Sequence, residues 1–196
     1  MREKILQTAS QLYSQDGYAG VSMRDVAAAV GVTPANLYHH FKDKEHLFRE
    51  SLAYVFAAKT LPVEAIVSSG ATPAHKFTAF VEWFVRATME DRVYVRLLTR
   101  ELLDADEERL AYLSDTVLKR PFDLLTDLIA QYGVQQDRAL TAASVIALIL
   151  GHIQLSALLP HLAGMDSGQV DAETLARHIL AQLQPALDQH ANEREG

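Results

Sequence analysis

The stretch SMRDVAAAVGVTPANLYHHFKDK, residues 22–44, decides the fold of this chain, because its pattern is that of two short helices joined by a tight turn. Ser22 is a favourable N-cap for the first helix, and Asp25, three residues later, takes the acidic position of a capping box. Gly31 supplies the left-handed residue that commonly ends a helix. Thr33 can cap the second helix, and Pro34 opens that helix at the position where its missing N–H costs little. The stretch therefore predicts a helix-turn-helix.

The second of these helices has an apolar face and a polar face. Leu37 and Phe41 are four residues apart and are expected to face inward against the first helix. The outward positions carry amide, phenol, hydroxyl and imidazole groups and no acid; they are Thr33, Ala35, Asn36, Tyr38, His39 and His40. A helix that lies in the major groove of DNA needs such a surface. Lys42 and Lys44, on either side of Asp43, are placed to meet phosphates.

A longer run of residues carries a resemblance to a known family. The run comprises residues 5–6, Ala9, 17–18, 22–27, 31–32 and 37–41, with Lys44 and Leu47. In this unbroken register, residues 3–52, about a quarter of the chain, resemble the DNA-binding domain of the TetR/AcrR family of bacterial transcriptional regulators. A lone helix-turn-helix pattern is weak evidence, whereas this many matching positions are specific.

The resemblance also implies which residues contact DNA. Position by position they are Ser22, Arg24, Thr33, Ala35, Asn36, Tyr38, His39, His40 and Lys44. Ala35 is suited to meet a thymine methyl group. Other roles stay open for Tyr38 as a partly buried residue, for His40 as a packing or capping residue, and for Lys44 as an ordinary surface lysine. No metal site is expected at His39 and His40, because neighbours on a helix point about 100° apart.

Charge and composition narrow the class of protein. The net charge is −7, but residues 1–52 hold six basic and six acidic side chains, so the whole excess of acid lies in residues 53–196. Because screening confines electrostatics to roughly 8 Å at physiological salt, an acidic remainder does not exclude DNA binding. The chain has no cysteine, which excludes disulfides and thiolate metal sites. Its first residues lack an apolar signal core, so a cytoplasmic protein is expected.

The periodicity beyond the helix-turn-helix predicts helices and no sheet. We expect an all-α chain with a DNA-binding domain at 1–50, which contains three helices, and a helical-bundle ligand-binding and dimerisation domain at 51–196. Leu61 and Pro62 are expected to end a helix, with a linker to Ala74, and Pro121 to kink or break another. The predicted helices outside the motif are 2–15, 43–59, 73–90, 92–103, 107–132, 138–162 and 172–190.

The apolar stretch 142–159 is barely long enough to span a membrane and contains polar residues, so we interpret it as a helix buried on several sides. A homodimer seam through the helices at 138–162 and 172–190 fits this pattern, as a four-helix bundle across a two-fold axis. The resemblance implies the same arrangement. A purely intrachain core is the alternative.

The C-terminal domain of such a family commonly holds a cavity for a small apolar or amphipathic effector. Residues that could line one here are Phe80, Trp83, Phe84, Tyr94, Arg96, Arg100, Tyr112, Phe122 and His152. Aromatic side chains at helical spacing are also what an ordinary core contains. For Arg96, Arg100 and Glu101 an interhelical ion pair is favoured over a contact with a ligand, and His152 could instead form a hydrogen bond at the seam.

These observations predict a ligand-responsive transcriptional regulator that binds a palindromic operator as a homodimer, and repression is what the resemblance favours. An apolar-ligand carrier or interaction module with a vestigial helix-turn-helix is the alternative. No enzyme is expected, because the chain lacks a nucleophile triad spacing, a phosphate-binding glycine loop and an HExxH pair. No cofactor is expected. The sequence names neither the operator nor the effector.

Overall fold

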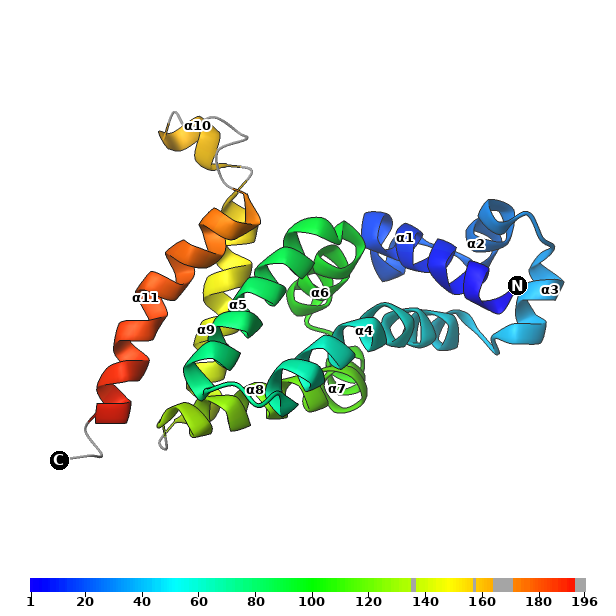
Figure 1. The fold of residues 1–196 in the computed structure, drawn as a ribbon. Helices are drawn as coiled ribbons and strands as arrows, with labels where there is room; N and C mark the ends of the chain where they lie inside the picture. The colour runs from blue at the N-terminus through cyan, green and yellow to red at the C-terminus, as the bar shows by residue number, and fades with distance from the viewer. Residues whose placement is uncertain (135–136, 157, 164–170, 193–196) are drawn as a thin grey trace. The chain divides into compact units, whose positions relative to one another are not determined.

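The computed structural model describes residues 1–134, 137–156, 158–163 and 171–192, and all regular structure in these ranges is helical (Figure 1). The elements are α1 (Arg2–Gly20), α2 (Met23–Val30), α3 (Pro34–His40), α4 (Lys44–Ser68), α5 (Pro73–Glu90), α6 (Arg92–Asp104), α7 (Glu107–Tyr112), a π-helical segment (Leu113–Leu118), α8 (Lys119–Tyr132), α9 (Arg138–Leu155), α10 (Leu159–Ala163) and α11 (Ala172–Asn192). The predicted all-α class is confirmed.

The chain folds into two compact units, each made of two separate segments. Unit 1 comprises residues 1–60 and 91–119, and unit 2 comprises residues 61–90 and 120–196. Helices α6 and α7 are therefore grouped with the first helices of the chain rather than with the later ones. The division at residue 50 into a DNA-binding and a ligand-binding domain remains a prediction about function.

Unit 1 is built on an aromatic and aliphatic core. Helix α1 packs on both α2 and α6, and α2 packs on α3. Tyr13 and Phe48 are almost fully buried and meet edge to face at 4.8 Å between ring centroids, with Tyr18 5.0 Å from Phe48. Leu37 and Phe41, predicted to face inward, are both fully buried. Such burial of large side chains supplies most of the stabilisation of a small unit.

Helix α1 contains a sharp break at Gly17. This residue has φ 73° and ψ 174°, a backbone conformation that is essentially restricted to glycine. The break leaves carbonyls of the preceding turn without helical partners, and Arg100 of α6 donates from Nε to the Ser14 carbonyl at 3.2 Å and from Nη2 to the Gln15 carbonyl. Arg100 thus satisfies the end of the first part of α1.

Unit 2 is a helical bundle in which α5 packs against α9 and α11. Apolar residues of α5 at helical spacing are buried, including Phe77 and Val81. Phe77 meets Tyr132 of α8 at 5.8 Å between ring centroids. The Tyr132 hydroxyl donates to Asp188 of α11 at 2.7 Å, and burial together with this carboxylate raises the pKa of Tyr132 to about 12. These contacts join the aromatic cluster of α5 and α8 to the last helix.

Two predicted helix ends were wrong, and a third predicted helix has the expected ends but differs from the prediction in its interior. Helix α4 continues through Pro62 to Ser68, because a proline removes a single backbone hydrogen bond and the following Val63 is buried. The predicted helix 138–162 ends at Leu155 and resumes as α10. The predicted helix 107–132 is unbroken but changes at Leu113–Leu118 to a π-helix, three residues before Pro121. The wider π turn is one of the recognised ways in which a long helix changes direction.

Helices α4 and α9 are long and apolar enough to meet a length-and-composition criterion for crossing a membrane, with mean hydropathies of 1.2 and 1.5 over an 18-residue window. Core helices of soluble proteins meet the same criterion, so it is weak evidence for a membrane span.

Candidate DNA-binding interface

The first helix of the motif is fixed by a complete capping box. The Ser22 hydroxyl accepts from the Asp25 N–H at 3.2 Å, and the Asp25 carboxylate accepts from the Ser22 N–H at 2.8 Å. The Ser22 hydroxyl also donates to the Asp25 carboxylate at 2.6 Å, and this bond, together with the one from the Ser22 N–H, holds the pKa of the exposed Asp25 carboxyl below its ordinary value. Both side chains predicted to contact DNA from this helix, Ser22 and Arg24, are exposed.

The turn between α2 and α3 has the geometry of a glycine C-cap. Gly31 has φ 80° and ψ 37°, and both its N–H and that of Val32 donate to the Ala27 carbonyl, at 3.0 and 2.9 Å. Thr33 then caps α3, with its hydroxyl accepting from the Asn36 N–H at 3.3 Å. The start of α3 is therefore set by the Gly31 turn, the Val32 hydrogen bond and the Thr33 cap. The turn and the cap were predicted from the sequence.

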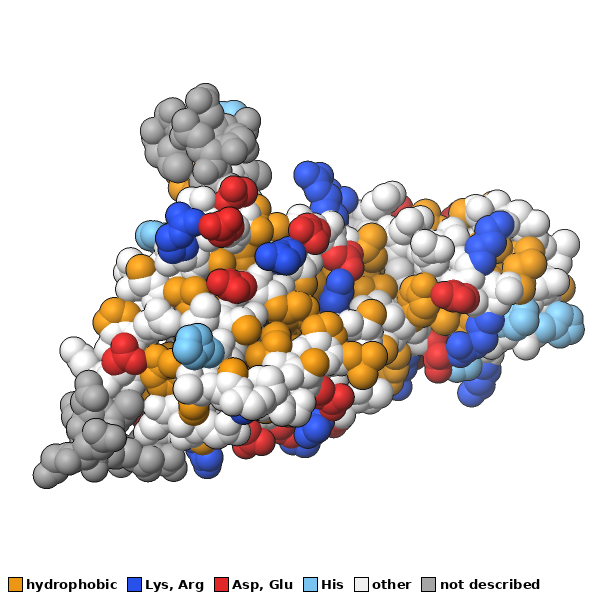
Figure 2. Space-filling model, in the orientation of Figure 1, with side chains coloured by type: hydrophobic (Ala, Val, Ile, Leu, Met, Phe, Trp, Pro, Cys, Tyr) orange, Lys and Arg blue, Asp and Glu red, His pale blue; other side chains and the backbone are white. Residues whose placement is uncertain are grey.

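Helix α3 presents a polar surface to solvent. Leu37 is its buried residue, while Thr33, Ala35, Asn36 and His39 are exposed and His40 is half-buried. The Tyr38 side chain is 55% exposed, so this residue is not part of the core. In Figure 2, histidine and basic side chains gather at the end of unit 1 that carries α3. All the outward residues predicted from the sequence thus lie on one accessible helix.

Lys44, at the start of α4, is held by an aromatic ring. Its ammonium lies 4.4 Å from the centroid of the Tyr18 ring and 3.5 Å from the Ala19 carbonyl. Burial of the half-buried side chain lowers its pKa, and the nearby Asp25 opposes that effect. Lys44 therefore contacts both a ring and a backbone carbonyl of α1. The sequence did not predict the role of Tyr18, because residues 26 positions apart leave no local pattern.

Arg109 of α7 reaches the same ring. Its guanidinium lies 4.9 Å from the Tyr18 centroid and 6.0 Å from that of Phe48, and its Nε donates to Glu101 of α6 at 2.8 Å. Glu101 is 2% exposed; burial raises the pKa of its carboxyl, and Arg109 opposes this rise. The interhelical ion pair expected for Glu101 is present, with Arg109 as its partner. Tyr18 thus lies close to one cation from α4 and to another from α7.

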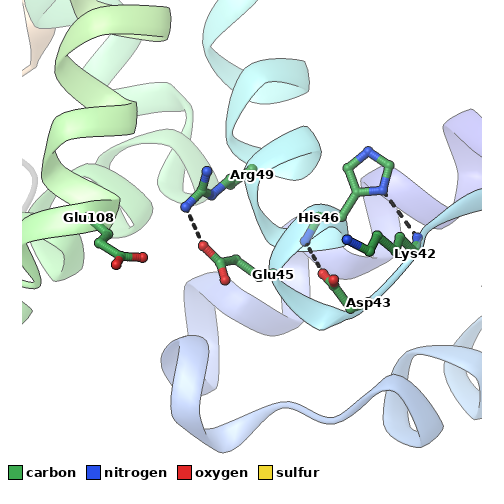
Figure 3. A pocket seen from close by; sticks show the side chains of 6 residues that line it. All are labelled: Lys42, Asp43, Glu45, His46, Arg49 and Glu108. Carbon is green, nitrogen blue, oxygen red and sulfur yellow. Dashed lines mark hydrogen bonds and ion pairs between the residues drawn. The ribbon is translucent and has the colours of Figure 1, made fainter.

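A polar pocket of about 460 Å³ opens at the start of α4 (Figure 3). It is lined by Lys42, Asp43, Glu45, His46, Arg49 and Glu108. Glu45 pairs with Arg49, four residues later on the same helix, and Arg49 also lies 5.2 Å from the ring of Tyr112, whose hydroxyl donates to the Arg49 carbonyl at 3.2 Å. The sequence did not single out this cluster.

The residues predicted to line an effector cavity fall into both units. Tyr94, Arg96, Arg100 and Tyr112 belong to unit 1, where Arg100 and Tyr112 donate to backbone carbonyls and Tyr94 packs on Phe56 at 4.8 Å. The others, Phe80, Trp83, Phe84, Phe122 and His152, belong to unit 2. Trp83 stacks on Phe84 at 5.9 Å, and Phe80 lies 5.8 Å from the same ring. A role for any of them in binding an effector remains a prediction.

The helices predicted to form a dimer seam expose apolar residues. Leu140 and Leu155 of α9 are 67% and 52% exposed, and Leu162 of α10 is 72% exposed. His152 of α9 lies 5.5 Å from His178 of α11 between ring centroids and bonds the Leu148 carbonyl at 2.8 Å. The described part of α9 therefore buries one face, through residues such as Val145 and Ile149, and leaves another apolar face uncovered.

Comparisons with known proteins agree with this geometry. The model of the bacterial regulatory proteins, tetR family, matches residues 5–51. The chain is 36% identical over 56 residues to the biofilm operon icaADBC HTH-type negative transcriptional regulator IcaR of Staphylococcus epidermidis. That match covers 29% of this chain and 30% of IcaR, so it spans less than a third of the relative.

Solved structures extend the likeness over almost the whole chain at the level of the fold. FadR from Bacillus subtilis, in complex with stearoyl-CoA, has a TM-score of 0.77 at 16% identity and covers 92% of this chain and 96% of its own. AibR in complex with isovaleryl coenzyme A and operator DNA has a TM-score of 0.71 at 24% identity and covers 94% and 99%.

The capped turn, the exposed face of α3 and the matched residues define a helix-turn-helix protein of the DNA-binding class. Residues 5–51 match the model of the tetR family of bacterial regulatory proteins, which agrees with the family resemblance expected from the residue pattern.

Proposed function

We propose that this chain is a ligand-responsive transcriptional repressor that binds a palindromic operator as a homodimer. The observation that carries the proposal is the acid-free, accessible face of α3, held by capped turns in a tetR-family domain. One helix-turn-helix reads a single half-site, and a two-fold dimer places two of them about one helical turn apart, roughly 34–36 Å. The proposed DNA contacts are those named from the sequence, with Tyr38 and Lys44 the most informative.

The proposed dimer uses the exposed apolar face of α9 together with α11. A symmetric seam of two helices from each subunit is a usual way to cover such a face. The proposed effector is a small apolar or amphipathic molecule that favours one of two conformations of the dimer. Because two proteins of similar fold are described as complexes with acyl-coenzyme A molecules, we include acyl-CoA thioesters in the effector screen. The protein is proposed to be cytoplasmic and to have no enzymatic role.

The test is DNA binding measured by fluorescence anisotropy, with an operator obtained by selection from random duplexes. Wild-type protein is expected to bind the selected duplex tightly and a scrambled duplex weakly, with a log–log salt slope of about −7 if the dimer neutralises about eight phosphates. Tyr38→Ala and Lys44→Ala are expected to lose at least about fivefold in affinity, since each removes a contact worth roughly 1–3 kcal/mol.

Two control variants test whether the loss of affinity is specific to Tyr38 and Lys44. Tyr54→Ala removes another exposed tyrosine of unit 1, and Lys76→Ala removes a lysine of unit 2, and neither is expected to change the affinity. Failure of the selection to enrich any duplex, with equally weak binding of all proteins, would instead favour the apolar-ligand carrier with a vestigial helix-turn-helix.

A further inference from the structure

The turn that joins α3 to α4 is closed by two reciprocal hydrogen bonds (Figure 3). The Asp43 carboxylate accepts from the His46 N–H at 2.8 Å, and Nδ1 of the His46 ring accepts from the Lys42 N–H at 3.1 Å. The pair is similar to a capping box, in which the third helical residue reaches back to the N-cap N–H, but here the ring reaches one residue further, to Lys42. Glutamate or glutamine usually takes that position, and here it is a histidine.

An imidazole makes the second bond conditional on pH. Nδ1 accepts a hydrogen bond only while it carries no proton, since both ring nitrogens of a protonated histidine are donors. Imidazoles change charge between about pH 5 and 8, whereas the amide oxygen of a glutamine remains an acceptor throughout that range. Protonation at Nδ1 therefore removes the acceptor for the Lys42 N–H and opens one side of the turn.

The surroundings of the ring offer the protonated form another partner. Nε2 of His46 lies 3.7 Å from the Glu50 carboxylate, one turn further along α4, and Glu50 also accepts from Arg2 of α1 at 2.6 Å. On its other side the ring packs on Phe41, 5.9 Å between centroids. A proton gained by His46 thus strengthens a contact with Glu50 within α4 while it breaks the contact with the turn.

Other charged groups face the same space. His40 lies beyond Phe41, 6.3 Å between ring centroids. Glu45, paired with Arg49, and Glu108 of α7 line the pocket next to His46. The lining of the pocket beside the ring thus includes two acids, Glu45 and Glu108, and one base, Arg49.

We propose that His46 is a positioning residue that makes the DNA-binding turn pH-sensitive. With a neutral ring, the capping box fixes the backbone of Lys42 and Asp43 and, through it, the direction in which Lys42 and Lys44 meet DNA phosphates. With a protonated ring, the turn loosens and must be ordered when DNA binds, which weakens binding. This inference rests on the proposed function, because its consequence is a change in DNA affinity.

The test compares wild type, His46→Gln and His46→Ala on one selected duplex between pH 5.5 and 8.5. The ratio of the wild-type Kd to the His46→Gln Kd is expected to be near one at pH 8 and to rise about fivefold at pH 5.5, the size of one lost cap bond. The ratio cancels the contributions of His39 and His40, which both proteins keep. His46→Ala is expected to bind about fivefold more weakly than His46→Gln at pH 8. A ratio that stays flat with pH would overturn the inference.

A second measurement needs no DNA. In wild type, the Lys42 amide resonance is expected to titrate together with the His46 ring in NMR spectra, and in His46→Gln it is expected to stay fixed. His75→Gln is the matched control, because His75 also bonds at a helix start, to the Thr72 hydroxyl at 2.8 Å, but in unit 2; it should leave both results unchanged. A Lys42 amide that does not titrate in wild type contradicts the pH-sensitive cap, whether or not the protein binds DNA. A titrating amide without DNA binding by any variant overturns the proposed function, and with it the positioning role.

Discussion

Arg109 shows how a single side chain can join segments that are far apart in the sequence. Besides Glu101, its guanidinium meets Asp104 at 3.3 Å and Asp106 at 3.4 Å, and it lies against the rings of Tyr18 and Phe48. Because only 12% of the arginine side chain and 3% of the Glu101 side chain are exposed, this pair is shielded from solvent. A shielded ion pair adds little to the free energy of unfolding compared with apolar packing of the same volume. Removal of one partner, however, leaves the other charge buried and unpaired, which is strongly destabilising.

We therefore expect Arg109→Ala to lower the free energy of unfolding by about 3 kcal/mol at pH 7.5. The loss should shrink as the pH falls. The pKa of Glu101 is already raised in the folded protein, chiefly by burial, and removal of Arg109 raises it further. A carboxyl group whose pKa is higher in the folded than in the unfolded state takes up its proton more readily when folded, so protonation favours folding.

Urea denaturation of wild type and Arg109→Ala at pH 7.5 and pH 5 measures this difference. The control is Arg96→Ala, which removes an exposed arginine of α6 and is expected to change the stability by less than about 0.5 kcal/mol. An equal loss for Arg109→Ala at both pH values would show that the unpaired Glu101 carboxylate is not its cause.

At the scale of elements, helix ends follow from local chemistry. The caps at Ser22, Gly31 and Thr33 were predicted because capping depends on residues three or four positions apart. The predicted helix 73–90 coincides with α5, because its apolar period and its flanking residues agree. The error at Pro62 arose because a local rule for proline takes no account of tertiary packing, and Val63, the next residue of the continuing helix, is buried.

Contacts between distant segments were not predictable in the same way. The packing of α6 on α1 depends on Arg100, and that of α7 on the aromatic core depends on Arg109, yet each arginine is more than 80 residues from its partner in α1. No periodic pattern encodes such a contact. The face of α3 was predictable from spacing alone, whereas the supporting roles of Tyr18 and His46 required the structure. The histidine at the fourth position after Lys42 was nevertheless a usable signal, since capping boxes normally hold Glu or Gln there.

The break in α1 gives a prediction at this scale. Gly17→Ala is expected to lower the free energy of unfolding by about 2 kcal/mol, because the observed φ and ψ are strained for any residue with a Cβ. The new Cβ would also lie 3.1 Å from Nη1 of Arg100. Thermal or urea unfolding measures the effect. Gly70→Ala is the matched control, because a Cβ there meets nothing within 4 Å; equal stability of the two variants would contradict a strained backbone at Gly17.

At the scale of the whole molecule, the excess of acidic charge and the exposed leucines of the proposed dimer seam both lie outside the helix-turn-helix. The first 52 residues are neutral before any histidine is protonated, and the acidic excess lies beyond them. The acidic residues that would repel DNA are thus distant from α3 in the sequence. The exposed leucines of α9 and α10 provide the apolar area that the proposed homodimer would cover.

Leu155→Glu is accordingly expected to convert the proposed dimer into monomers, because a carboxylate cannot enter an apolar seam without losing its hydration. Size-exclusion chromatography with light scattering measures the mass. The control is Leu103→Glu, which places the same charge on another exposed leucine, 81% exposed and in unit 1. Leu103→Glu should remain dimeric, and a dimeric Leu155→Glu would place the seam elsewhere.

The division of each unit into two chain segments has a consequence for synthesis on the ribosome. When residues 1–60 have emerged, the helices of the DNA-binding motif are present, but α6 and α7 are still to be made. The Ser14 and Gln15 carbonyls then lack Arg100, and the Tyr18 ring lacks Arg109. Residues 61–90, which belong to unit 2, are translated before residues 91–119. Unit 1 therefore remains incomplete while this segment of unit 2 is made. The nascent chain thus completes its DNA-binding unit only after residue 119 has left the exit tunnel, later than the position of the motif in the gene suggests.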